Sequence, residues 1–295
     1  MWRTPAGAHD PSVPVLQSPP SLRIEPLTRA IGAVVEGIDL GAPLADHQLA
    51  DLRAAIHRHR VVFVRGQHLS VDGHRRLGEQ FGPLAVSPLH QLLGTSRTVS
   101  TIEDDADRPP AGFDWHTDLS WTAAPPSIGI LHAVEIPTVG GDTLWASLPA
   151  ALAALPVDVQ DAFSHLRAEH AADASLLRSV ERHHGPDVAL RLRRANPPMS
   201  HPLVRVHPVT GEPLLFLSPL YLRRLVGIDR RRGDRQLREL NGLLDDPHVQ
   251  VRWRWEAGDV ALWDEVATCH RALTDHYPRR RVMRRCVVEG VPVSG

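Results

Sequence analysis

Short apolar stretches separated by polar turns dominate the chain after residue 114 and predict a largely β structure. Helical spacing interrupts this pattern at about residues 149–166 and 233–244. Residues 167–200 are rich in Arg and His and favour neither pattern. We expect strands at residues 115–121, 127–135, 142–145, 203–207, 214–217, 249–255, 259–263 and 281–289.

The N-terminal third mixes helical spacing with isolated strands. Leu49, Leu52 and Ile56 recur at helical intervals, and the later Gly82-Pro83 pair is a helix-ending signal. Many short strands with inserted helices are typical of a double-stranded β-helix, a cupin-like jelly roll. In this region we expect helices over 46–60 and 71–81, strands within 31–40 and at 61–64 and 97–102, and an acidic loop at 103–112.

Residues 1–20 differ from the rest in composition. They contain Pro5, Pro11, Pro14, Pro19 and Pro20 and little continuous apolar sequence. Such a segment cannot bury enough apolar surface to offset its ordering entropy. We therefore expect a disordered extension followed by one domain over residues 21–295, which we predict to be mainly β with inserted α-helices.

Composition narrows the class of protein. The formal net charge of −1 and the pI near 7.0 argue against a nucleic-acid binder. No apolar run reaches membrane-spanning length. Cys269 and Cys286 form no metal-type or disulfide pattern, which favours a reducing cytoplasm. We expect a cytoplasmic protein with a small-molecule substrate, and the sequence leaves a homo-oligomer, a dimer or a tetramer, open.

All 33 basic residues are Arg, which decides how an anion can be held. The guanidinium binds carboxylates and sulfo groups through paired N–H donors. Arg281 and Arg285 lie four residues apart, so on a strand they share a face. The alternative is a solvated basic edge strand, which would suit the neighbouring Arg279, Arg280 and Arg284 equally well.

His116 and Asp118, with the distant His270, have the composition of a 2-His-1-carboxylate metal site. On an extended strand the first two side chains point to one face, and such a set binds Fe(II) with positions left open. The alternative is a strand-end His and Asp bonded to loop backbone. His57 and His59 are a weaker metal pair because they fall at a predicted helix end.

Gly140-Gly141 predicts a hairpin turn just before Thr143. One interpretation is an ordinary hairpin turn without a function of its own. A functional interpretation places the Thr143 hydroxyl against a bound carboxylate.

The motifs taken together resemble the TauD/TfdA family of Fe(II)- and 2-oxoglutarate-dependent dioxygenases, typified by taurine dioxygenase. The resemblance runs from about residue 24 to about residue 290. It rests on Trp115-His116-Thr117-Asp118, Pro125-Pro126, Gly140-Gly141-Asp142-Thr143, Arg167-Ala168-Glu169-His170, Asn196-Pro197-Pro198, His201-Pro202, His207-Pro208, Trp253-Arg254-Trp255, Trp263-Asp264, His270 and Arg281-Val282-Met283-Arg284-Arg285.

The resemblance implies a role for each matching residue. His116, Asp118 and His270 match the iron ligands, and O2 would be the second co-substrate. Thr143 and Arg281 match the residues that hold the distal carboxylate of 2-oxoglutarate. Arg285 matches the position that binds the substrate's acidic group. The implied reaction is hydroxylation of a small anionic compound, a sulfonate, alkyl sulfate or carboxylate, with release of succinate and CO2.

The expected substrate pocket departs from the family pattern. Its positions fall on Ser87, His90, Ser175 and Tyr221, while Leu176 replaces a Phe. Glu265 stands where Asn usually follows Trp-Asp. These departures leave open a second enzyme function, a biosynthetic hydroxylase of an amino-acid-like or secondary-metabolite substrate. A non-enzymatic alternative is a metal-binding barrel without catalysis. A lid is expected from residues 84–112 and 167–200.

Overall fold

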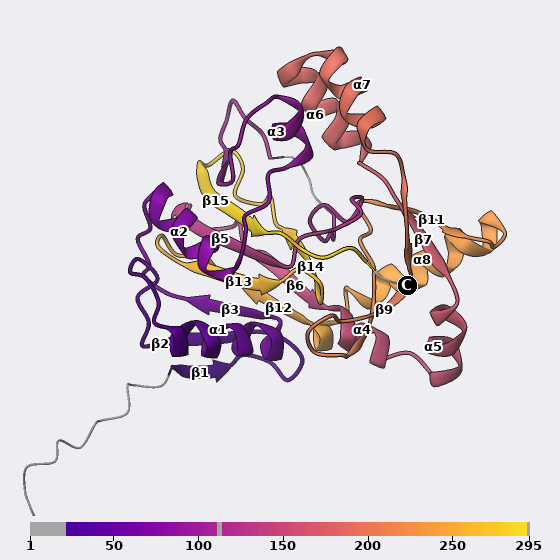
Figure 1. Ribbon diagram of the computed structural model, residues 1–295, viewed down its shortest axis with the longest axis horizontal. Coiled ribbons are helices and arrows are strands. Elements are labelled where there is room, and N and C mark those ends of the chain that lie inside the picture. Colours follow the sequence, from indigo (N-terminus) through magenta and orange to yellow (C-terminus); the bar gives the residue numbers. More distant parts are fainter. Residues whose placement is uncertain (1–21, 111–113, 294–295) are drawn as a thin grey trace, which may run out of the picture.

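The computed structural model describes residues 22–110 and 114–293, which form packed sheets with helices on the outside (Figure 1). The predicted extension at residues 1–20 lies outside them. The strands are β1 (Arg23–Pro26), β2 (Ala33–Glu36), β3 (Val61–Val64), β4 (Ser100–Asp104), β5 (Ile128–Glu135), β6 (Thr143–Ser147), β7 (Arg167–His170), β8 (Met199–Pro202), β9 (Val204–Val206), β10 (Pro213–Leu215), β11 (Leu222–Val226), β12 (Gln250–Trp253), β13 (Val260–Asp264), β14 (Thr268–Ala272) and β15 (Arg281–Val288). The helices are α1 (Asp46–His59), α2 (Val71–Phe81), α3 (Pro88–Leu92), α4 (Leu148–Ala153), α5 (Val157–Ser164), α6 (Ala174–His184), α7 (Pro186–Ala195) and α8 (Arg230–Leu243), with a 3-10 turn η1 (Pro247–Val249).

Two sheets position the candidate site. The larger has the order β1-β2-β3-β13-β5-β15-β4 and joins strands from both ends of the chain; its β2–β3 pair is parallel and its other pairs are antiparallel. The smaller has the order β12-β6-β14 and is antiparallel. Two further sheets, β11-β7-β8 and β10-β9, complete the set in the described residues.

An aromatic core joins the two principal sheets. Phe63 of β3 stacks on Trp253 of β12 with ring centroids 4.0 Å apart, and Trp145 of β6 meets Trp263 of β13 at 5.9 Å. Strand alternation turns Leu144 and Ala146 of β6 to the opposite side, into a second apolar cluster with α4 and α8. The smaller sheet is thus buried on both faces, which holds its side chains in fixed positions.

Helices α1 and α2 cover the outer face of the larger sheet. Leu52 and Ile56 of α1 and Leu77 and Phe81 of α2 are buried against it. Ser70 begins α2 by accepting a hydrogen bond from the Gly73 N–H at 3.0 Å. The sequence predicted both helices and the buried strand β3 between them, and the structure confirms all three.

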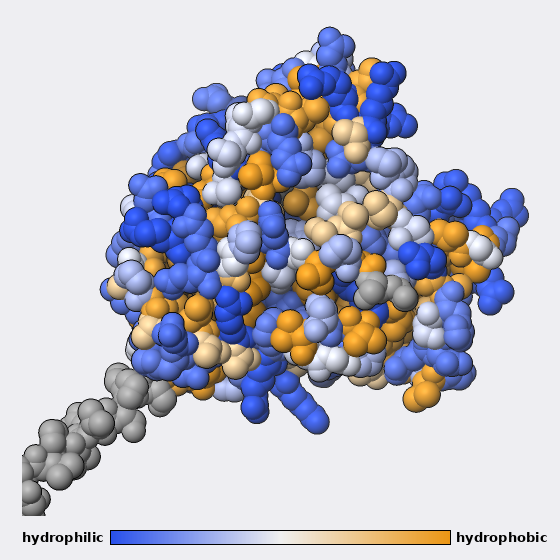
Figure 2. Space-filling model, in the orientation of Figure 1, coloured by the Kyte–Doolittle hydropathy of each residue, from blue (hydrophilic) through white to orange (hydrophobic). Residues whose placement is uncertain are grey.

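Helices α3, α6 and α7 project from one side of the sheets and pack on one another (Figure 1). They share a small apolar cluster that includes Leu89, Val180 and Leu192. Polar and apolar side chains are interspersed over the face in Figure 2. No helix in the described ranges has both the length and the apolar character needed to cross a membrane.

The predicted strand at residues 115–121 is wrong. His116 forms an isolated bridge with His270, and the chain then turns, with the Thr122 N–H bonded to the Leu119 carbonyl at 2.9 Å and Leu119 at φ 50°. The Thr117 hydroxyl donates to the Thr268 carbonyl at 2.9 Å. Side-chain and turn hydrogen bonds therefore replace a strand ladder here.

Other elements differ at their boundaries. The predicted helix over residues 149–166 is two helices, α4 and α5, separated at Pro156, as expected when Pro interrupts helical spacing. Residues 167–200, which the pattern did not assign, form β7, α6, α7 and the start of β8. The strand expected at residues 97–102 runs from Ser100 to Asp104, into the segment predicted as a loop.

Candidate active site

His116, Asp118 and His270 converge at the wall of a cavity of about 240 Å³. One ligand atom from each residue lies within 4.8 Å of the other two, and all three residues are buried. The backbone bridge between His116 and His270, with N···O distances of 3.0 and 2.8 Å, brings the two imidazoles together. Asp118 reaches them through the turn that follows, so its position does not come from strand alternation.

The histidines have the protonation that metal ligands need. His116 Nδ1 lies 2.9 Å from the Asp114 carbonyl oxygen, which can only accept, so Nδ1 carries the proton and Nε2 the lone pair. Burial lowers the pKa of both His116 and His270, and keeps the imidazoles neutral. Neutral imidazoles beside a carboxylate form a donor set suited to a divalent metal.

Asp118 lies between a cation and a second carboxyl group. Its Oδ1 accepts from Arg285 Nη1 at 2.8 Å, and its backbone N–H donates to Glu265 Oε2 at 3.2 Å. Burial alone raises the pKa of Asp118, but Arg285 and the two histidines outweigh it and lower the pKa below its ordinary value. Burial, and then the Asp118 charge, raise the pKa of Glu265 well above its ordinary range. Asp118 is therefore the ionised member of this pair.

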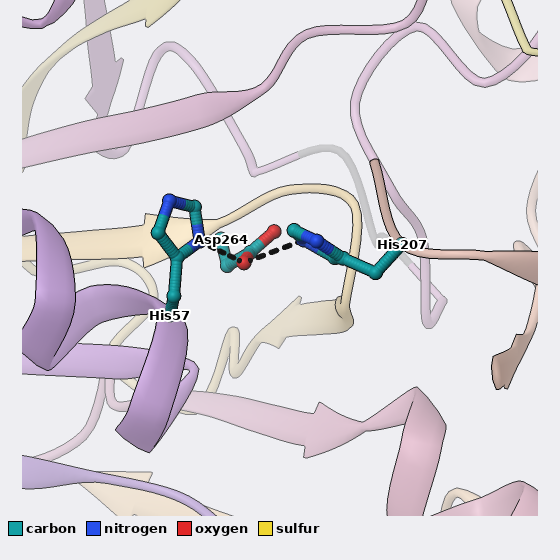
Figure 3. Close-up of side chains that lie close together, drawn as sticks. All are labelled: His57, His207 and Asp264. Atoms are coloured by element: carbon teal, nitrogen blue, oxygen red, sulfur yellow. Dashed lines mark hydrogen bonds and ion pairs between the residues drawn. The ribbon is translucent and has the colours of Figure 1, made fainter. Parts of the chain in front are cut away.

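A second His, His and Asp cluster, formed by His57, His207 and Asp264, has a different hydrogen-bond pattern (Figure 3). His57 Nδ1 and His207 Nε2 approach Asp264 Oδ2 at 2.8 and 2.9 Å. Although burial raises the pKa of Asp264, hydrogen bonds from His207 and His57 outweigh this and lower it to about 2, so the carboxylate accepts from both rings.

Backbone contacts fix the His207 tautomer in that cluster. His207 Nδ1 accepts from the N–H groups of Val209 and Thr210, each at 3.1 Å, which places the ring proton on Nε2. Both nitrogens that face Asp264 then carry protons and have no lone pair for a metal. The cluster is a hydrogen-bonded clamp between α1, β13 and the β9–β10 hairpin.

Thr143 and Arg281 line the same cavity on the side next to the Gly140–Gly141 turn. Trp255 Nε1 donates to the Thr143 hydroxyl at 3.0 Å, which leaves that hydroxyl's own proton for another acceptor. Arg281 Nε donates to the Gly141 carbonyl at 3.1 Å. A Cβ on Gly141, whose φ is 75°, would lie 2.9 Å from Arg281 Cδ, so the close approach requires glycine.

The expected substrate residues fall into three groups. Tyr221 and Arg285 line the main cavity, and Leu176 joins them. Ser87 lines a smaller adjoining cavity that shares Asp118 and Arg285. His90 and Ser175 line neither: His90 follows the α3 N-cap, and Ser175 bonds Asp173 at the start of α6. Their contact with the substrate stays a prediction.

Two titratable residues at the cavity wall were not predicted. Asp104 was assigned to a loop, and His276 lies in the segment between β14 and β15. The register of β4 and β15 places Asp104 directly opposite Arg281. Because these two residues are 177 positions apart in the sequence, no local sequence pattern predicts that they pair.

The sequence and the fold of this chain are similar to those of known dioxygenases. Residues 23–287 match the family model described as taurine catabolism dioxygenase TauD, TfdA family. An alpha-ketoglutarate-dependent sulfate ester dioxygenase from Pseudomonas putida is 33% identical over 92% of this chain and 91% of its own length. An alkylsulfatase from Acinetobacter baylyi is 32% identical over 93% and 87%. The crystal structure of a taurine dioxygenase from Burkholderia xenovorans superposes with a TM-score of 0.77 at 33% identity, covering 92% of both chains.

Proposed function

Because the chain belongs to the TauD/TfdA family of 2-oxoglutarate-dependent dioxygenases, we propose that His116, Asp118 and His270 bind its Fe(II). The supporting observation is the set of buried donor atoms, in which the Asp118 Oδ2 atom has no hydrogen-bond partner among the described residues. A buried carboxylate oxygen without a partner destabilises the fold by its desolvation free energy unless a bound ligand, such as a metal ion, interacts with it. Bound iron supplies O2 activation and C–H oxidation coupled to decarboxylation of the 2-oxo acid.

We assign the 2-oxoglutarate end of the cavity to Thr143 and Arg281. The Thr143 hydroxyl and the Arg281 guanidinium offer charge-assisted hydrogen bonds to a carboxylate. The chain's own contribution is to orient the co-substrate and to exclude water from it. We also propose that the sheets form a jelly-roll core, that residues 21–295 are one domain, and that the enzyme is cytoplasmic, in keeping with two buried free thiols.

The substrate we propose is a small organic anion with an apolar body, of the alkyl sulfate, sulfonate or carboxylate class. Arg285 would bind the anionic group, and the apolar residues of the cavity would pack on the rest. Alkyl sulfates are favoured because two of the relatives are named for sulfate esters. The apolar residues meant here are Ile102, Pro110, Leu131, Leu176, Leu273 and Met283.

Hydroxylation at the carbon that bears the sulfate oxygen would give a product that fragments. The C–O bond to sulfate breaks, the new hydroxyl becomes a carbonyl, and its proton leaves with the sulfate. One O2 and one 2-oxoglutarate are consumed, and an aldehyde, hydrogen sulfate, succinate and CO2 are formed. A biosynthetic hydroxylase of an amino-acid-like or secondary-metabolite substrate is the alternative, motivated by Ser87, His90 and Glu265.

A substrate panel tests this proposal. Succinate is measured from iron-loaded protein with 2-oxoglutarate and O2 in the presence of alkyl sulfates, sulfonates, aryloxy acids and amino acids. We expect alkyl sulfates to stimulate turnover most and to release sulfate in equal amount. Stimulation by amino acids alone would favour the biosynthetic alternative, and an absence of succinate from protein shown to hold iron would contradict the assignment of these residues as an active site.

A further inference from the structure

Asp104, His276 and Arg281 meet at the co-substrate end of the cavity from three separate segments. Asp104 ends β4 directly opposite Arg281 of β15, and His276 comes from the connection that follows β14. His276 is 2% exposed, yet it lines the cavity. The established features of the fold account for Arg281 but give the other two no role.

The His276 ring has unused hydrogen-bonding capacity. Neither nitrogen has a hydrogen-bond partner within the described residues, although Nε2 lies 3.4 Å from Asp104 Oδ2 as an ion-pair contact. Its Nδ1 would lie 3.3 Å from a Cβ placed on Gly141, so the ring sits against the glycine turn beside Arg281. A buried imidazole that lacks partners indicates a ligand that supplies them.

The negative charge of Asp104 offsets the positive charge of Arg281, so a second cation at this end of the cavity would strengthen the binding of a carboxylate. Asp104 faces Arg281 across the strand pair, and burial, acting against Arg281, raises the pKa of Asp104. Asp142 is paired with Arg252 at 2.7 Å, and the exposed Asp275 accepts the Gly141 N–H at 2.9 Å. Arg281 and an ionised Asp104 cancel, so an arriving carboxylate meets little net positive charge. A proton added to the His276 imidazole when the ligand binds would restore one positive charge.

We propose that His276, held by Asp104, is a third donor to the distal carboxylate of the 2-oxo acid and takes up a proton from solvent as that co-substrate binds. This inference rests on the proposed function, because it needs 2-oxoglutarate in the cavity. His276 then selects 2-oxo diacids over 2-oxo monoacids, since a monoacid has no distal carboxylate to share the added proton. Arg281 and Thr143, which line the same end of the cavity, would bind the same carboxylate.

Isothermal titration calorimetry of the full-length, Mn(II)-loaded protein tests the proposal without turnover. 2-Oxoglutarate is titrated in two buffers of different ionisation enthalpy, from mildly acidic to mildly alkaline pH. We expect uptake of close to one proton near neutral pH and weaker binding as the pH rises. His276→Gln should abolish the uptake and weaken binding about tenfold to a hundredfold, the range expected for a lost hydrogen bond to a charged group.

The Asp104→Asn variant distinguishes two roles for His276: a donor whose protonation is coupled to ligand binding, and a side chain with a structural role alone. It removes the charge that cancels Arg281, so binding should stay tight and become independent of pH, without proton uptake. His248→Gln is the matched control, because His248 forms an exposed His–Asp pair with Asp246 at 2.9 Å. That variant should titrate like the unaltered protein. Thermal unfolding of each variant establishes that it is folded.

Three results would overturn the inference. One is equal affinity and equal proton uptake in the His276→Gln variant. Another is weakened binding with the proton uptake intact, which assigns the ring a structural role. A third is proton uptake that persists in Asp104→Asn. In all three cases the proposed function stands, whereas failure of the unaltered Mn(II)-loaded protein to bind 2-oxoglutarate overturns the proposed function together with this inference.

Discussion

Arg285 Nη1 lies 2.8 Å from Asp118 Oδ1, so the cation assigned to the substrate contacts the carboxylate assigned to the metal. The same strand carries Arg281 four residues earlier, and both side chains line one cavity. Substrate, metal and co-substrate positions are therefore linked through one face of β15. An anionic substrate would share Arg285 with Asp118, and binding of that substrate would alter the charge that a ligand of the metal experiences.

Replacing Arg285 with Ala should remove substrate recognition while leaving the co-substrate site in place. We expect substrate-stimulated succinate formation to fall by about 100-fold or more, because truncating one partner of a buried charge pair costs on the order of 2–5 kcal/mol. Slow succinate formation without substrate should persist, since Thr143 and Arg281 are unchanged. Arg224→Ala, which alters an exposed pair with Glu169, is the control. Undiminished stimulation in Arg285→Ala would exclude Arg285 as the anion site.

The two His, His and Asp clusters should differ in metal content. Asp118→Asn should lose most of the bound metal after dialysis, because an amide cannot supply the anionic ligand. Asp264→Asn should keep about one metal per chain but lose about 1–3 kcal/mol of unfolding free energy, because the clamp to His57 and His207 is broken. Elemental analysis and chemical unfolding measure the two effects. Loss of metal from the Asp264 variant alone would reverse the assignment.

Much of the candidate site could be predicted from the sequence, but partly for the wrong reason. His116, Asp118 and His270 were identified by residue type and resemblance, while the expected strand that was to align the first two is a turn. Arg281 and Arg285 were expected to share a face because period-2 alternation is a local property. Asp104 could not be predicted because only the sheet register brings it opposite Arg281, and His276 could not because it lies in a connection without a helix or strand pattern.

Glu265 should act by holding the Asp118 backbone in place. Glu265→Ala removes the acceptor of the Asp118 N–H and leaves that donor buried, so the affinity for Mn(II) should fall about 10- to 100-fold. Glu265→Gln keeps an acceptor of the same length and, like the protonated Glu265 carboxyl group, a donor next to the Asp118 carboxylate, so its affinity should stay close to that of the unaltered protein. Metal titrations of both variants measure the difference. Equal affinities for the Ala and Gln variants would show that Glu265 does not position Asp118.

The His74–His132 pair between α2 and β5 should make the fold sensitive to acid. The rings lie 6.1 Å apart, both are buried, and burial lowers the pKa of each to about 4. In the unfolded chain these pKa values return to about 6.5, so the unfolded state binds more protons in between. Stability from this pair is therefore fully present above pH ~6.5 and is lost as pH falls toward about 4.

Replacing His74 with Leu isolates this effect, since a neutral side chain of similar size remains buried. For His74 the linkage amounts to about 2 kcal/mol by pH ~5, so the unfolding free energy of the Leu variant should fall less steeply over that range. Denaturant unfolding at a series of pH values measures the slope. Substituting the exposed His248 in the same way should leave the slope unchanged. An unaltered slope in His74→Leu would mean that other groups govern the acid sensitivity of the protein.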